Sequence, residues 1–245
     1  MTRLTASILV VCSGLHGCGT TNLGSCPGVN PLVKCTEADT DEAIRIALDE
    51  EDLEKARTLL EQAIADEPEN YNRYPLLGAV YAGLAGFRLL NAISSAGSSS
   101  EDSSVTSAMD AFLPDPASMT RTDYIANIDL MALAVSTLQA IPAEFLANAE
   151  TDKYANSASQ QLPVYLAAHA AMYMKLFTFN FDTGAPDLDQ LTNLGTADAD
   201  TIIALLTAAA ASGGSFGSIA TTTLATINAG GGNNRDNLAN FLGNQ

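Results

Sequence analysis

Residues 52–81 read DLEKARTLLEQAIADEPENYNRYPLLGAVY, and the pattern of this stretch decides which fold the chain is expected to adopt. Over residues 52–65 the apolar side chains recur on one helical face, while charged and polar side chains occupy the other. Pro68 then predicts the end of this helix. A second helix is predicted over residues 71–94, and because residues 75–87 carry no charge, this helix is expected to be buried on all sides.

Eight positions of this stretch share the spacing of a known helical repeat. They are Ala56, Leu60, Ala63, Pro68, Tyr74, Leu77, Gly78 and Tyr81. The pattern resembles the second helix of a tetratricopeptide repeat followed by the first helix of the next repeat. The match covers about 45 residues, because it fails upstream at Ala43 and Ala47 and downstream at Leu90. The resemblance implies antiparallel helical hairpins in a degenerate array with a groove for a partner's peptide or helix; a generic helical hairpin is the alternative.

The rest of the ordered chain predicts further helices and no convincing strand. A Ser/Gly-rich loop is expected over residues 94–104, and Thr120 with Asp123 forms a capping-box pattern that opens the next long helix. That helix is expected to run through Leu138. The other expected helices cover residues 105–112, 143–150, 161–179 with a start near Pro163, 197–212 and 216–228, with a short terminal helix around Leu238, Phe241 and Leu242. Threonines leave a strand conceivable over 216–228. The chain is therefore expected to be all-α, with roughly nine helices.

The first residues carry the features of an export signal. Arg3 precedes an apolar stretch, and Leu15, Gly17 and Cys18 close it. This ending resembles the lipobox of bacterial lipoprotein precursors, although His16 departs from the usual small or aliphatic residue. The resemblance implies cleavage before Cys18, which would carry diacylglycerol; an ordinary secretory signal is the alternative, and the apolar run is far shorter than the ~20 residues of a spanning helix.

The expected domain organisation follows from this export signal. We expect a signal peptide over residues 1–17, a tether over 18–38, an all-α tetratricopeptide-like domain over 39–229, and a Gly-rich hinge with a short helix over 230–245. After cleavage Cys26 and Cys35 are the thiols left beside the anchor, and an oxidising envelope favours a disulfide between them, with free thiols as the alternative. Gly19 in place of an aspartate after Cys18 would favour the outer membrane facing the periplasm.

Charge and motifs limit the function classes. The formal net charge of −17 disfavours binding to nucleic acid and to anionic lipid, so membrane attachment must come from acyl chains. Nucleophile-elbow, phosphate-loop and dinucleotide patterns are missing from the sequence. Asp182, Asp187 and Asp189 bracket a Gly-Pro turn and could hold calcium, but a solvated acidic turn is the default, and we expect no enzyme, cofactor or metal.

His169 is the one histidine that remains after loss of the signal, and it lies one turn from both Tyr165 and Tyr173. Phe177, Phe179 and Phe181 extend this aromatic cluster. Aromatic residues at helical spacing usually form core, and a histidine among them is more often structural than catalytic. The sharper alternative is that Tyr165, His169, Tyr173 and Phe177 line a site for a hydrophobic ligand.

Two functions are compatible with these features. The favoured one is a lipid-anchored, non-catalytic interaction module, an adaptor or scaffold that binds an envelope complex or a transporter subunit through its helical groove. The alternative is a periplasmic binding or carrier protein for a hydrophobic small molecule, similar to the helical-repeat lipoproteins associated with TRAP-type transporters.

Overall fold

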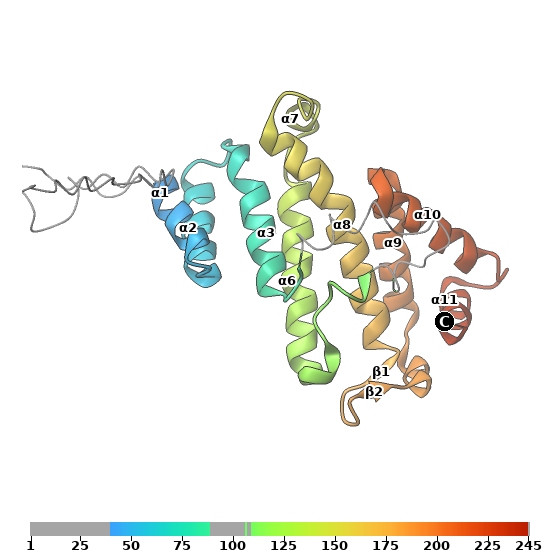
Figure 1. Cartoon of the computed structure of the whole chain (residues 1–245). Coiled ribbons are helices and arrows are strands. Elements are labelled where there is room, and N and C mark those ends of the chain that lie inside the picture. The colour runs from blue at the N-terminus through green and yellow to red at the C-terminus, as the bar shows by residue number, and fades with distance from the viewer. Residues whose placement is uncertain (1–39, 89–105, 107–108, 245) are drawn as a thin grey trace, which may run out of the picture. The chain divides into compact units, whose positions relative to one another are not determined.

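The structure, a computed structural model, describes residues 40–88, 106 and 109–244. These residues form an all-α fold, as the sequence predicts (Figure 1). The long helices are α1 (Thr40–Asp49), α2 (Leu53–Asp66), α3 (Tyr74–Leu84), α6 (Arg121–Gln139), α8 (Lys153–Leu176), α9 (Thr196–Ser212), α10 (Gly214–Asn228) and α11 (Asn234–Gly243). Short elements are α7 (Ala143–Leu146), the 3-10 helices η1 (Tyr71–Arg73), η2 (Pro116–Ser118) and η3 (Leu188–Asn193), and strands β1 (Phe179–Asn180) and β2 (Ala185–Pro186).

Helix α2 agrees closely with its prediction. Asp52 accepts a hydrogen bond from the Lys55 backbone N–H at 3.1 Å and so caps the first turn. The helix buries Ala56, Leu60 and Ala63 and ends before Pro68. The apolar face identified in the sequence is therefore the face that packs.

The prediction of one helix over residues 71–94 is wrong. The chain first makes the 3-10 turn η1, and α3 then ends at Leu84, well before Ser94. Gly86 follows with φ of +79°, a left-handed conformation that glycine adopts without strain and that stops the helix. As predicted, α3 leaves no residue exposed.

Helix α6 begins with the capping box that the sequence predicts. The Thr120 hydroxyl accepts a hydrogen bond from the Asp123 backbone N–H at 3.2 Å, and the Asp123 carboxylate accepts one from the Thr120 backbone N–H at 3.4 Å. The helix predicted over 143–150 is much shorter, because α7 ends at Leu146.

Helix α8 starts earlier than predicted. The expected start near Pro163 is wrong, because Asp152 caps the backbone N–H groups of Tyr154 and Ala155 at 2.8 and 3.0 Å and opens the helix there. Pro163 lies inside α8 and is buried. Tertiary packing of this central helix therefore outweighs the helix-breaking tendency of one proline.

After α8, strands β1 and β2 form a small antiparallel hairpin in which Phe179 pairs with Pro186. Helices α9, α10 and α11 follow close to their predicted positions, and residues 216–228 are helical, not extended. Gly213, with φ of +75°, makes the corner between α9 and α10. A Cβ on Gly217 would lie 3.0 Å from the Ala209 carbonyl oxygen, so α9 and α10 approach closely at this glycine.

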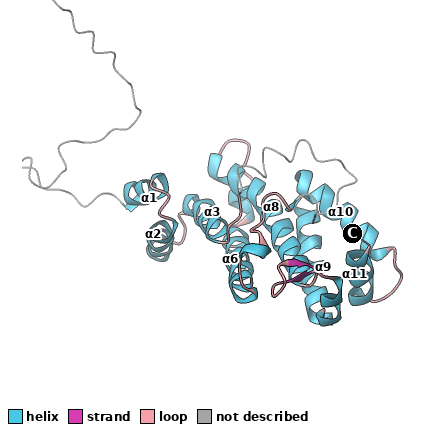
Figure 2. Ribbon diagram, turned by 60° about the horizontal axis from the view of Figure 1, so that its bottom comes forward, coloured by secondary structure: helices cyan, strands magenta, loops and turns pink. Residues whose placement is uncertain are grey.

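Consecutive helices pack against one another in chain order: α1 on α2, α2 on α3, α3 on α6, α6 on α8, α8 on α9, α9 on α10 and α10 on α11 (Figures 1 and 2). Helix α8 also contacts α3 and α10 and is buried along most of its length. Within the described ranges, no helix combines the length and the apolar character needed to cross a bilayer.

Candidate functional site

The residues of the repeat-like motif hold helices together, and none of them lines either of two pockets found among the described residues. All but Tyr74 and Pro68 are buried, and these two are joined by a hydrogen bond of 2.8 Å from the Tyr74 hydroxyl to the Pro68 carbonyl oxygen. Tyr81 donates to the Glu61 carboxylate at 2.8 Å, and burial together with that carboxylate raises the pKa of Tyr81 to about 12. Gly78 lets α3 approach α6, since a Cβ there would lie 3.3 Å from Leu138.

Three of the four predicted ligand-lining residues, Tyr165, His169 and Tyr173, lie on α8, and Phe177 is the C-cap residue of that helix, so the four form a row of side chains spaced four residues apart. Tyr165 is fully buried and packs edge-on against Phe87, with 6.0 Å between the ring centroids. The rings of His169 and Tyr173 are 5.2 Å apart, and Tyr173 is half-buried. Phe177 is buried at the end of the row. Within this row, Tyr173 is therefore the one partly exposed residue, and Tyr165, His169 and Phe177 are buried.

Polar atoms in this row lack hydrogen-bond partners. Among the residues that the structure describes, the Tyr165 hydroxyl and both ring nitrogens of His169 find no such partner, nor does the Oε1 atom of Gln161, which lies one turn before Tyr165. Gln161 uses only its amide nitrogen, which donates to the Ser157 hydroxyl at 2.8 Å. The sequence analysis missed Gln161 as a site residue, although its spacing of four from Tyr165 places it on the same face.

The electrostatics of the row are those of neutral groups. Burial lowers the pKa of His169 to about 4, so its imidazole is uncharged at neutral pH. Burial also raises the pKa of Tyr165 above its ordinary value. The neutral imidazole offers one donor and one acceptor, and the phenol offers both functions. The chemistry available to this row is hydrogen bonding.

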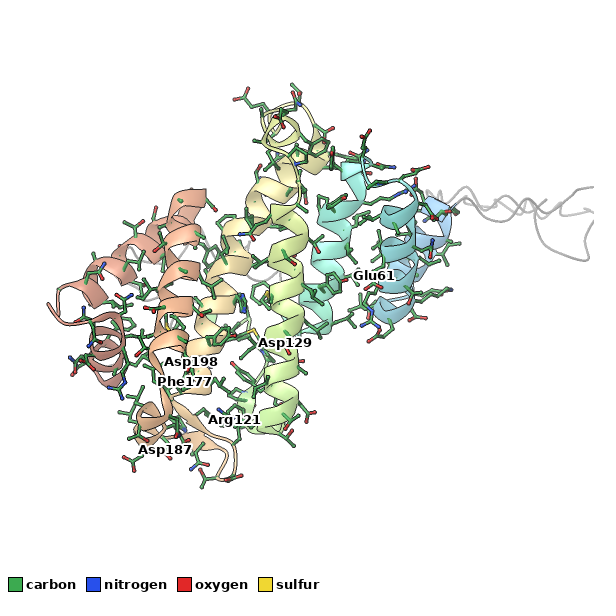
Figure 3. All side chains as sticks on the ribbon, turned by 180° about the vertical axis from the view of Figure 1, so that it is seen from behind. Glu61, Arg121, Asp129, Phe177, Asp187 and Asp198 are labelled. Carbon is green, nitrogen blue, oxygen red and sulfur yellow. The ribbon has the colours of Figure 1, made fainter. Side chains whose placement is uncertain are left out.

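Two carboxylates from neighbouring helices act electrostatically on Tyr173, the partly exposed residue of the row. The pKa of Tyr173 is raised by burial first, and then by the negative charges of Asp129 and Asp198. Asp129 belongs to α6 and Asp198 to the first turn of α9, and these helices flank α8 (Figure 3). No local pattern in the sequence reveals these partners, because they come from separate helices. We refer to Tyr173, Asp129 and Asp198 as the acidic surface.

A separate pocket of about 460 Å³ lies near the C-terminal end of α8. Its lining comprises Thr106, Asp110, Asp115, Pro116, Lys175, Thr178, Phe179, Pro186, Leu188 and Leu242. Lys175 pairs there with Asp110 at 2.9 Å. The aromatic cluster expected from the sequence is thus divided: Phe179 lines this pocket and contacts Phe181, which in turn packs on Tyr124 of α6.

The acidic turn after β1 has a structural role. Asp187 accepts hydrogen bonds from the side chains of Asn180 and Gln190 and from the Asp189 backbone N–H, and these bonds lower the pKa of Asp187. Asp182 and Asp189 are exposed. Across the described part of the chain, His, Cys, Asp and Glu nowhere form a group of three or more able to hold a metal ion.

Several sequence predictions lie outside the described residues. These are the signal peptide over 1–17, the lipid-modified Cys18, the tether over 18–38, the disulfide between Cys26 and Cys35, and the loop over 94–104. Comparison of the chain with protein-family models, with curated proteins and with solved structures gave no match.

Proposed function

We propose that this chain is a lipid-anchored envelope protein that acts as a non-catalytic interaction module. Cys18 carries the anchor, and the helices that follow bind a partner protein, either an envelope complex or a transporter subunit, at the outer membrane facing the periplasm. Two observations support this proposal. Helices that pack in chain order are typical of repeat arrays, whose extended surfaces bind peptides or helices, and the acidic surface supplies contact chemistry for such a partner.

The acidic surface is the observation on which this proposal rests most. A half-buried tyrosine offers a rigid aromatic contact with a polar tip, a combination that is enriched in binding hot spots. Asp129 and Asp198 lie close enough for their charges to raise the pKa of Tyr173. A partner segment that brings lysine or arginine beside an apolar side chain fits this arrangement, and the net charge of −17 would speed its approach.

Site-specific photocrosslinking in native membranes tests the proposal. A photoreactive residue at position 173 should give one discrete crosslinked band, and the double change Asp129→Asn and Asp198→Asn should weaken that band. The same residue at Ser218, exposed on α10, serves as the control and should give no band. Equal crosslinking at both positions, or none at position 173, would contradict a partner at the acidic surface.

The anchor is tested separately. Mass spectrometry of the mature protein should find an acylated Cys18 at its N-terminus, and Cys18→Ser should move the protein from the membrane fraction to the soluble fraction. An intact residue 1 in the membrane-bound protein would rule out this mode of attachment.

A second candidate function is a carrier for a hydrophobic small molecule, and the pocket near the end of α8 favours it. Its volume of about 460 Å³ falls within the range of ligand pockets, and Phe179, Leu188 and Leu242 give it an apolar wall.

An environment-sensitive dye, 1-anilinonaphthalene-8-sulfonate, should bind the full-length protein and lose fluorescence with Leu188→Asp. Leu133→Asp is the matched control, because Leu133 is also an exposed large apolar residue but lies on α6 outside this pocket. Equal loss with both changes would exclude the pocket as the dye site.

A further inference from the structure

Three polar side chains lie on the buried part of α8. Gln161, Tyr165 and His169 are each more than nine-tenths buried, at 7 %, 0 % and 7 % exposure. Their positions are one helical turn apart, so they share a face and lie within about 12 Å along the helix axis. Within the described part of the chain, four of their polar atoms have no hydrogen-bond partner. Unsatisfied polar atoms therefore gather along one row of α8.

Such a row is costly for the protein in the absence of a ligand. Each buried donor or acceptor without a partner costs about 1–3 kcal/mol, against a typical total stability of about 5–15 kcal/mol. The cost is recovered when a bound molecule supplies the missing hydrogen bonds. Buried polar groups without partners in a native fold therefore call for an explanation, and a bound molecule that supplies the missing hydrogen bonds is one.

We propose that Gln161, Tyr165 and His169 bind an uncharged small molecule that carries both a hydrogen-bond donor and an acceptor, such as a carboxamide or an alcohol. The molecule enters beside Tyr173, which is half-buried and whose ring contacts that of His169. This site is additional to the partner-binding function proposed above and shares Tyr173 with the acidic surface.

The charges around the row select against ionic ligands. The side chains of the row are neutral, so a carboxylate or an ammonium group bound there would be buried without a counterion, which is strongly unfavourable. Beside Tyr173, Asp129 and Asp198 repel a carboxylate. An uncharged group that donates to the imidazole or to Gln161 Oε1 and accepts from the Tyr165 hydroxyl meets both requirements.

Three probes of similar size separate these possibilities: propionamide, propionate and propylammonium. Each is titrated into the full-length protein in detergent micelles, while two-bond ¹H–¹⁵N spectra follow the ring nitrogens of His169. Propionamide should shift both nitrogens in a saturable manner, and the two ions should not. A response to either ion as strong as that to propionamide, or a response to none of the three, would overturn the proposal, because the row would then hold water alone or a charged ligand.

Matched tyrosine variants test the position of the site. Tyr165→Phe keeps the buried ring and removes the hydroxyl, so propionamide should bind about fivefold more weakly. Tyr124→Phe is the control, because the Tyr124 hydroxyl is equally buried and unpartnered but lies on α6 against Phe181. Equal weakening in both variants would refute a site in the row. Thermal melting of both variants without probe confirms that they fold.

Discussion

At the scale of single residues, His169 is the side chain with the clearest physical consequence. It is held neutral by burial, it has no hydrogen-bond partner among the described residues, and its ring packs on Tyr173. A group of this kind makes the free energy of unfolding depend on pH.

We predict a stability loss in mild acid that depends on His169. Its pKa is about 4 in the folded chain against 6.5 for the free side chain. Between these values the unfolded chain binds the proton more readily, so stability is full above pH 6.5 and falls by about 3 kcal/mol as the pH approaches 4. Urea unfolding at pH 7 and pH 4 measures this loss.

His169→Gln removes the titrating group while keeping a polar side chain of similar reach. The variant should lose about 3 kcal/mol less than the unmodified chain over the same pH interval. The two chains should then differ mainly in this window, because every other titrating group is common to both. Identical pH profiles would show that protonation of His169 is not linked to unfolding.

His169 also illustrates what the sequence can reveal at this scale. Its spacing from Tyr165 and Tyr173 places the three on one face, and the structure confirms this arrangement. The sequence could not show that its ring nitrogens lack hydrogen-bond partners among the described residues. This lack depends on how side chains from several helices pack around the ring. Asp129 and Asp198 were missed for the same reason.

At the scale of elements, local signals decide where the helices begin and end. Thr120 and Asp123 bond each other reciprocally at the start of α6, and Gly213 ends α9 with a positive φ. Caps and glycine stops of this kind involve residues close together in the chain, so they can be recognised in the sequence. The start of α8 was not predicted correctly. The sequence analysis placed it near Pro163, whereas the residue that caps the helix is Asp152, which lies well upstream.

Thr120→Ala should destabilise the protein by about 1 kcal/mol, because the first turn of α6 loses its cap. Chemical unfolding measures the difference. Thr122→Ala is the control, since Thr122 is exposed in the same turn and should change stability by much less. Comparable losses in both variants would show that the capping box contributes nothing specific.

Gly217→Ala should cost about 1–3 kcal/mol, because the added Cβ would lie 3.0 Å from the Ala209 carbonyl oxygen and would push α9 and α10 apart. The neighbouring change Ser218→Ala, on the exposed side of α10, should be close to neutral. Thermal unfolding of the two variants compares them. A neutral Gly217→Ala would contradict the close approach of these helices.

At the scale of the whole molecule, the described helices form a chain of neighbours centred on α8. The sequence predicts the all-α class correctly, since its apolar residues recur at helical spacing in segment after segment. It does not predict that α8 contacts the four long helices α3, α6, α9 and α10, because that depends on the angles at which the hairpins stack.

This organisation predicts graded stability along the chain. Helix α1 has its main contacts with α2 alone, whereas α8 is surrounded by α3, α6, α9 and α10. Native-state hydrogen exchange should therefore show α1 opening at a lower free energy than α8, which should exchange through global unfolding. Equal protection of α1 and α8 would indicate one cooperative unit instead.

Arg73 links α1 to α2 at the N-terminal end of the described helices. Its guanidinium is buried and bonds the Asp41 carboxylate of α1 at 3.0 Å, the Glu67 carboxylate at 3.0 Å and the Ala63 carbonyl oxygen of α2 at 2.7 Å. Tension applied to the chain before Thr40 would reach α1 first and would load the contact between Arg73 and Asp41. Helix α1 would therefore unfold first under load, while the central helices stayed folded.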